Sequence, residues 1–226
     1  MHAVYESREI VSEVADDFNR ALSGELAFET TSEPIELINQ SLIWFVEAIN
    51  EKLHQNVTWN QLAITRRHLA AKPELFEKAF TYLTTAQEHP EILNTSITAQ
   101  NKATYRPLLQ WIGGYLVAKI SSTIWFDEIF RRIDLHDGDK NLVVINGLRY
   151  PSDAAVVRAH GGIILEIQRP LESEQDPRDI TEVNRGDIKP DIVLLNNGSI
   201  NELEAIAAKL WADLSISSYQ KQYSAS

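Results

Sequence analysis

Short, almost uninterrupted apolar segments in the second half of the chain restrict its fold more than any other feature. They cover residues 142–145, 163–167 and 192–195 and consist mostly of Val, Ile and Leu. Continuous runs of this length are typical of strands buried on both faces, as in parallel sheets that helices cover. The sequence therefore predicts an α/β core with a parallel sheet in the C-terminal half.

Helical segments separate and follow these predicted strands. Residues 152–159 have helical spacing, with Ser152 suited to the N-cap position and the glycine pair 161–162 suited to ending the helix. A strand, a helix and a second strand in one sheet imply a parallel pair with a right-handed crossover. Residues 199–202 form a capping box, which predicts a further helix over 202–214.

The middle of the chain has the periodicity of helices. Apolar residues recur at spacings of three and four within 35–49, 75–83 and 108–120. The five tryptophans are expected to pack within these helical parts, because they lie at helical spacings. The predicted organisation is an N-terminal strand and helix of the α/β core at 1–30, a helical lobe at 31–135, and the rest of the core at 136–226 with a lid segment at 171–190.

Composition and charge exclude several classes of protein. The chain has 21 Lys and Arg against 32 Asp and Glu, a net charge of −11, which disfavours binding to nucleic acid or to an anionic membrane. No apolar run approaches the ~18 residues of a membrane span. The first residues carry acids where a signal peptide needs basic and apolar ones, so we expect a cytoplasmic protein.

Metal and thiol chemistry are not expected. The chain has no cysteine, which excludes disulfides, thiolate catalysis and iron–sulfur clusters. Its six histidines include no pair at a metal-ligating spacing.

Arginines follow two of the predicted strands. Arg149 comes shortly after the strand at 142–145, and Arg169 comes directly after the strand at 163–167. Ligands bind at the carboxyl ends of parallel strands, and guanidinium groups at this edge suit phosphate oxygens. The alternative is that each arginine is a surface ion-pair partner in a chain with excess acid.

A long polar segment follows Arg169. Residues 171–189 are too many for an ordinary connection, and segments of this kind often close over a site as a lid. The alternative is a solvated acidic loop. Arg178 and Arg185, together with Arg169 beside the segment, favour the lid.

Taken together, these segments resemble a known family. In chain order they are ADDFNRAL at 15–22, RPLLQWIG at 106–113, NGLRYPSDAAVVRAHGGIILEIQRP at 146–170 and DITEVNRGDIKPDIVLLNNGSINELEAIAAKL at 179–210. Their order and spacing resemble the phage-type deoxynucleoside monophosphate kinases, which are P-loop nucleotide kinases. The resemblance implies an α/β, P-loop nucleotide-kinase-like parallel sheet with a helical lobe.

The resemblance also implies which residues bind the substrate. Arg106, Gln110 and Arg149 correspond to positions on the acceptor side, and Arg169 to an arginine that neutralises the transferring charge. The corresponding lid residues are Arg178, Thr181, Glu182 and Arg185. The resemblance leaves the catalytic residue unassigned and implies no resident metal.

Three positions depart from the family pattern. The chain contains no G-x-x-x-x-G-K-S/T motif, whose backbone and lysine cradle the donor phosphates. Asn146 stands where the family has a carboxylate able to organise Mg²⁺, and Asp179 stands at the histidine position of the lid. We therefore expect the first strand and the P-loop to be missing from the sheet.

A missing first strand would leave a gap in the middle of the sheet. Unpaired backbone groups on the two flanking strands are costly if they are buried. Three arrangements would resolve this: the remaining strands close together in a new order, a partner chain donates a strand, or the sequence starts downstream of a true beginning.

Three functional hypotheses follow. The favoured one is a degenerate relative, or pseudokinase, that binds a nucleoside monophosphate and lacks the ATP site. The second is an active kinase whose P-loop comes from another chain or an upstream segment, in which case ATP and Mg²⁺ are required. The third is a structural or assembly protein, whose negative charge and tryptophan-rich lobe would form the surface for a partner. We also expect a protein partner or a second copy of the chain to cover the gap in the sheet.

Overall fold

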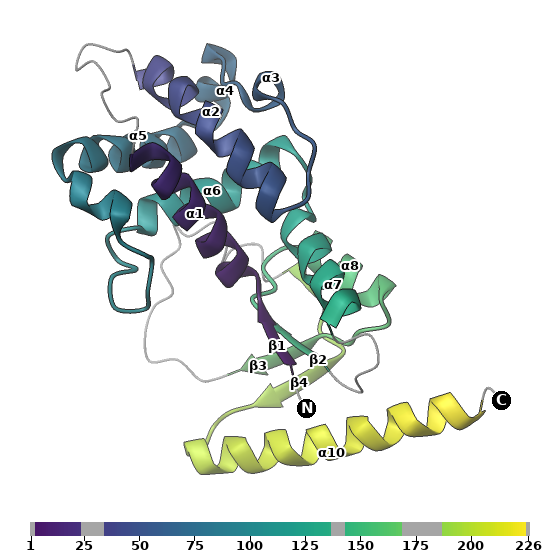
Figure 1. Ribbon diagram of the computed structural model, residues 1–226. Helices are drawn as coiled ribbons and strands as arrows, with labels where there is room; N and C mark the ends of the chain where they lie inside the picture. The colour runs from purple at the N-terminus through teal and green to yellow at the C-terminus, as the bar shows by residue number, and fades with distance from the viewer. Residues whose placement is uncertain (1–2, 24–33, 137–142, 169–186, 225–226) are drawn as a thin grey trace. The chain divides into compact units, whose positions relative to one another are not determined.

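The structure is a computed structural model that describes residues 3–23, 34–136, 143–168 and 187–224 (Figure 1). It is mixed α/β, mostly helical, with short parallel sheets. The chain divides into two compact units. We call residues 7–128 the helical unit, and residues 1–6 with 129–226 the sheet unit. The fold class predicted from the sequence is confirmed.

The helical unit contains the three helices that the apolar periodicity predicted, α2 (Pro34–Lys52), α5 (Pro73–Glu88) and α6 (Arg106–Lys119). It also contains elements that this periodicity did not indicate: α1 (Ser7–Ser23), α3 (Trp59–Leu62), α4 (Arg66–Ala71) and the 3-10 helix η1 (Pro90–Asn94). The next helix, α7 (Ile124–His136), contains the boundary between the two units.

Aromatic side chains from three helices form the centre of the helical unit. Phe18 of α1, Phe45 of α2 and Trp111 of α6 are each fully buried. The ring centroids of Phe18 and Phe45 are 5.2 Å apart, and those of Phe45 and Trp111 are 5.5 Å apart. Trp125 is also buried, as expected, but Trp59 is 40% exposed and so contributes little to this core.

Helix α1 lies in the helical unit, which differs from the expected assignment of residues 1–30 to the α/β core. The reason is its apolar face, on which Val14, Phe18 and Leu22 are fully buried. A polar contact adds to this packing, because the Tyr82 hydroxyl of α5 donates a hydrogen bond to Oδ1 of buried Asn19. Of the N-terminal segment, the strand alone belongs to the sheet unit.

The sheet unit contains two separate parallel pairs of strands. β1 (Ala3–Glu6) pairs with β2 (Val143–Asn146), and β3 (Leu165–Gln168) pairs with β4 (Ile192–Leu195). The three apolar runs of the sequence therefore form strands within two residues of the expected positions. β2 and β3 are not hydrogen-bonded to each other within the described residues, so the remaining strands do not close into one sheet there.

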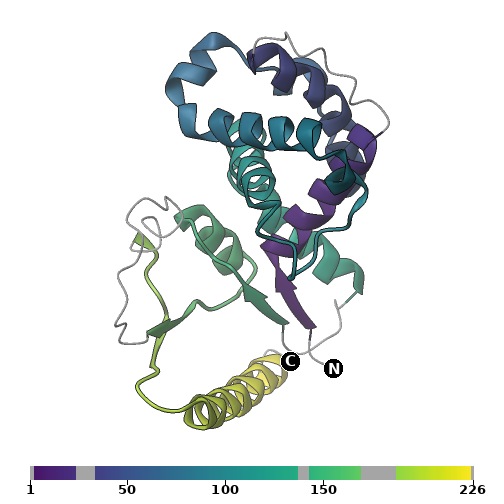
Figure 2. The same ribbon diagram turned by 90° about the vertical axis from the view of Figure 1, so that its left-hand side faces the viewer.

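Helices follow β2 and β4 as predicted. α8 (Pro151–Ala159) connects β2 to β3, and α10 (Ile200–Ser224) continues from β4 to the C-terminal end of the described chain, in yellow in Figure 2. Gly161 follows His160, the C-cap residue of α8, and has a φ of +76°, and the Gly162 N–H donates to the Val157 carbonyl. Glycine is suited to this left-handed position, so the predicted end of the helix is confirmed.

The start of α8 is capped differently from the prediction. Ser152 lies inside the helix, because Tyr150 occupies the N-cap position. The carboxylate of Asp153 accepts the N–H groups of Arg149 and Tyr150, both at 3.0 Å. Asp153 is 6% exposed, and this burial raises the pKa of its carboxyl from 3.8 to about 6.

Replacing Asp153 with Asn should stabilise the protein near neutral pH. A carboxyl whose pKa is higher in the folded protein than in the unfolded chain binds its proton more tightly when folded, so stability falls as the pH rises through that interval. Asn removes the buried charge and keeps an oxygen to accept the same N–H groups. We expect a gain on the order of 2 kcal/mol at about pH 8 and none near pH 4, measured by urea unfolding.

A matched substitution separates the effect of the buried Asp153 carboxylate from the effect of removing any one negative charge. Asp134 is an exposed carboxyl on α7, and Asp134→Asn should leave the free energy of unfolding almost unchanged at both pH values. A destabilised Asp153→Asn protein at about pH 8 would show that the ionised carboxylate is needed for the cap.

Candidate functional site

A hollow of about 390 Å³ lies between α5 and α6 in the helical unit. It brings together two residues that the sequence predicted for substrate binding, Arg106 and Gln110. They are one turn apart on α6, so their side chains lie on the same face of that helix. The residues that line the hollow are Glu74, Glu77, Lys78 and Thr81 of α5, and Ala103, Arg106, Pro107 and Gln110.

The residues on either side of Arg106, buried Tyr105 and half-buried Pro107, fix the start of α6. Tyr105 is 2% exposed, and its hydroxyl donates to the Ile92 carbonyl at 2.7 Å. Pro107 follows Arg106 in the first turn, where proline is compatible with a helix. Arg106 itself is exposed, so its guanidinium is held at the N-terminal end of α6 and stays accessible.

Close packing of α5 against α6 sets the width of the hollow. A Cβ on Gly114 would lie 2.9 Å from Cδ2 of Leu75, so glycine permits a closer approach of the two helices than a larger residue would. Further along, the rings of Phe76 and Tyr115 meet edge to face at 6.3 Å. The hydroxyl of buried Tyr115 donates to the Leu62 carbonyl, which ties α6 to the last residue of α3.

The charges in the hollow are of both signs. Arg106 and Lys78 are cations, while Glu74 and Glu77 are carboxylates. Within the described parts of the chain, no ion pair involves any of these four side chains. The hollow therefore suits a ligand that carries both an anionic group and hydrogen-bond donors.

Sequence reasoning missed the α5 side of this site. The polar residues 74, 77, 78 and 81 share one helical face, but the sequence offers only a polar stripe opposite an apolar one. Such a stripe is the usual pattern of a solvated helix surface, so nothing in the sequence separated Lys78 from other exposed lysines.

Arg149 lies in the sheet unit, in the turn between β2 and α8. Gly147 in the same turn has a φ of +91°, a conformation that glycine adopts readily. The Arg149 N–H donates to the Asp153 carboxylate at 3.0 Å, and the residue is half-buried and makes a further interaction. Its predicted contact with a substrate phosphate stays a prediction.

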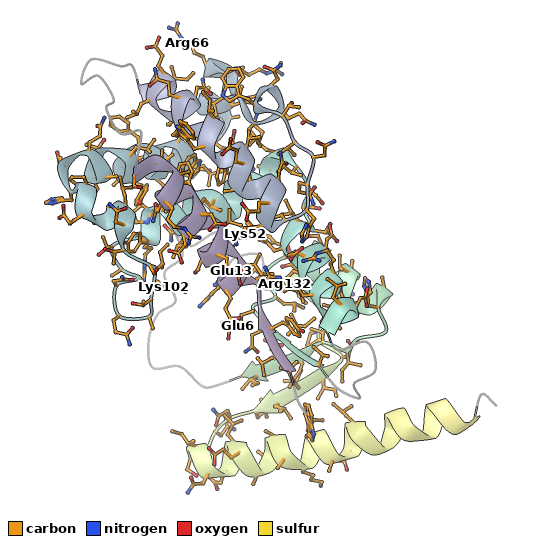
Figure 3. All side chains as sticks on the ribbon, viewed as in Figure 1. Glu6, Glu13, Lys52, Arg66, Lys102 and Arg132 are labelled. Atoms are coloured by element: carbon orange, nitrogen blue, oxygen red, sulfur yellow. The ribbon has the colours of Figure 1, made fainter. Side chains whose placement is uncertain are left out.

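A carboxylate lies beside Asn146 at the end of the first strand pair. Nδ2 of Asn146 donates to Oε1 of Glu6 at 3.1 Å, because β1 and β2 are parallel and Glu6 pairs in register with Asn146. Figure 3 labels Glu6, the last residue of β1. Sequence reasoning did not identify Glu6, although a glutamate directly after a short apolar run was a usable signal. This edge of the sheet therefore carries one acid from β1 where the family pattern expects one on β2.

The other predicted site residues lie outside the described residues. They are Arg169, Arg178, Thr181, Glu182 and Arg185. The predicted lid segment at 171–190 is described only at 187–190.

Neither a metal-binding cluster nor a membrane-spanning helix is found in the described residues. In those parts of the chain, no group of three His, Cys, Asp or Glu side chains is arranged to hold a metal ion. None of the described helices combines the length and apolar character that a membrane span requires.

Short parallel strands that are connected through helices, together with a helical lobe, define a nucleotide-kinase-like α/β protein. The family model for deoxynucleotide monophosphate kinase matches residues 29–206, which is more than half of the chain. The chain therefore belongs to the deoxynucleotide monophosphate kinase family, as the resemblance in the sequence indicated. Searches of curated proteins and of solved structures gave no match.

Proposed function

We propose that this polypeptide binds a deoxynucleoside monophosphate in the hollow between α5 and α6 and does not bind ATP by itself. One observation carries the proposal: Arg106 and Lys78 line the same hollow, and neither forms an ion pair with a described residue. A guanidinium binds phosphate oxygens in pairs, and an ammonium adds a point charge.

The remaining residues of the hollow suit the nucleobase. Glu74 and Glu77 are acceptors for the exocyclic amino group of a base, and the Gln110 amide is both a donor and an acceptor. A nucleoside monophosphate carries a dianionic phosphate at one end and such donors at the other. This pattern matches the mixed charge of the hollow better than a purely anionic ligand does.

Residues on the donor side support the absence of ATP binding. The sequence has no G-x-x-x-x-G-K-S/T motif to cradle the donor phosphates. The end of the β1–β2 pair has one carboxylate, Glu6, which is hydrogen-bonded to the neutral amide of Asn146. Mg²⁺ in kinase sites is held by one or two carboxylates and by the substrate phosphates, so Glu6 would hold Mg²⁺ only where another group cradles the donor phosphates.

Replacing Lys78 with Gln should weaken monophosphate binding about fivefold, since a partly exposed charge pair is worth ~1 kcal/mol. Glutamine keeps most of the side-chain length and removes the charge. Titration calorimetry with a deoxynucleoside monophosphate measures the change. Lys72→Gln is the matched control, because Lys72 is exposed just before α5 and does not line the hollow. Equal effects of the two substitutions would remove Lys78 from the site.

A second candidate function is an active deoxynucleoside monophosphate kinase whose P-loop comes from another polypeptide or segment. The absence of hydrogen bonds between β2 and β3 in the described residues favours it, because a further strand could pair there. Transfer of phosphate from Mg–ATP by the 226-residue chain alone would show that no such addition is needed.

A cytoplasmic location of the protein also stays a prediction from the sequence.

A further inference from the structure

The relative direction of α5 and α6 sets the order of the side chains along the hollow. A Cβ on Gly114, late in α6, would touch the side chain of Leu75, early in α5. At the other end of the pair, the ring centroids of Tyr82 and Tyr105 are 6.5 Å apart, so the later turns of α5 lie beside the start of α6. The two helices therefore run antiparallel along the hollow.

This antiparallel order separates the cations of the hollow from one of its carboxylates. Glu74, in the first turn of α5, lies toward Gln110 of α6. Lys78 is one turn further along α5 and lies toward Arg106, the first residue of α6. The hollow therefore has a cationic part and, about 5 Å further along, a part with one carboxylate and one amide.

The side chains of Glu74 and Gln110 are accessible to a ligand. Both residues are exposed, and neither side chain forms a hydrogen bond or an ion pair with a described residue. An ionised carboxylate only accepts hydrogen bonds, through two oxygens, whereas an amide both donates and accepts. This part of the hollow therefore suits a group with two neighbouring donors beside an acceptor.

Of the four DNA bases, guanine alone has this arrangement on its pairing edge. Its N1–H and 2-amino groups are adjacent donors, and its O6 is an acceptor beside them. Cytosine and adenine have a ring nitrogen with a lone pair next to the amino group, and thymine has a single N–H between two carbonyls. A carboxylate accepts both guanine donors at once, but it meets a repelling lone pair on each of the other bases.

We propose that Glu74 and Gln110 select guanine, which makes deoxyguanosine monophosphate (dGMP) the preferred ligand of the hollow. Glu74 accepts hydrogen bonds from N1–H and the 2-amino group, and the Gln110 amide donates to O6. The phosphate then lies at Arg106 and Lys78. This inference rests on the proposed monophosphate site and adds the base that the site prefers.

Deoxyinosine monophosphate (dIMP) tests the role of Glu74, because it differs from dGMP only in lacking the 2-amino group. Titration calorimetry of the 226-residue chain should give about tenfold weaker binding for dIMP than for dGMP, since a hydrogen bond to a carboxylate is lost. Thymidine monophosphate should bind more weakly still. In Glu74→Gln the ratio of the two affinities should fall to about twofold or less. The ratio cancels the effect of the removed charge on the phosphate, which both ligands carry.

Two further substitutions locate the effect within the hollow. Glu77 is a carboxylate on the same helix, three residues further along and beside Lys78, so Glu77→Gln should keep the full preference for dGMP over dIMP. Gln110→Leu should weaken dGMP and dIMP equally, about fivefold, because both carry O6.

Four results would overturn the assignment of guanine: equal affinity of the unsubstituted chain for dGMP and dIMP, binding of thymidine monophosphate as tight as that of dGMP, a preference for dGMP that survives Glu74→Gln, or unchanged affinities in Gln110→Leu. In each of these cases, weakening of all monophosphates by Arg106→Ala would leave the proposed site in place. Absence of binding for every monophosphate would overturn the site and the base preference together.

Discussion

Replacing Arg106 with Ala should weaken the binding of a deoxynucleoside monophosphate by about tenfold to a hundredfold, while leaving the unfolding transition unchanged. The affinity falls because hydrogen bonds to a charged group are worth ~1.5–3 kcal/mol, and the guanidinium makes them with a dianionic phosphate. Stability is expected to hold, because Arg106 is exposed and forms no ion pair with a described residue. Titration calorimetry and a urea transition measure the two quantities.

Arg66 provides a matched control for this substitution. It is the first residue of α4, as Arg106 is the first residue of α6, and both are exposed. Arg66→Ala therefore removes the same charge from the same kind of helix position outside the hollow. An affinity that does not change on Arg106→Ala, or that falls equally on Arg66→Ala, would contradict the assignment of the hollow as the phosphate site.

Replacing Trp111 with Ala should destabilise the protein by about 3–5 kcal/mol, the usual cost of truncating a fully buried tryptophan. The indole lies between two other buried rings, with centroid distances of 5.8 Å to Phe18 and 5.5 Å to Phe45. Its removal would leave a cavity among three helices. The free energy of unfolding in urea, followed by circular dichroism, measures the loss.

Two further tryptophan substitutions make this prediction specific. Trp59→Ala should cost about 1 kcal/mol, because Trp59 is 40% exposed and loses mainly a hydrogen bond to the Asn39 carbonyl. Trp111→Phe keeps a ring and removes an indole N–H that has no hydrogen-bond partner in the described residues, so it should cost well under half as much as alanine. Similar losses for Trp111→Ala and Trp59→Ala would contradict the assignment of Trp111 to the centre of the core.

The elements of the fold could be predicted because each has a local signal. The apolar runs that became β2, β3 and β4 lacked the three-to-four spacing of helices, and the glycine pair after α8 ended that helix as expected. The place of α1 could not be predicted, because its amphipathic face fits either a sheet or a helical bundle. The contacts of Phe18 with Phe45 and of Asn19 with Tyr82 place α1 in the helical bundle.

Only part of the candidate site could be predicted from the sequence. Arg106 and Gln110 were identified because they lie in a segment that resembles the family, whereas Lys78, Glu74 and Glu77 lie in a segment with no distinctive pattern. Glu6 could not be placed beside Asn146 either, because their contact depends on the pairing of strands 140 residues apart. Such contacts depend on tertiary packing, which residue spacing does not encode.

Titration of the 226-residue chain with deoxynucleoside monophosphates, and separately with Mg–ATP, tests the central claim most directly. We expect saturable binding of a monophosphate that is weakened tenfold or more by Arg106→Ala, with no heat of binding for Mg–ATP. Tight binding of Mg–ATP with turnover by this chain alone would contradict it, and so would the absence of binding for both ligands.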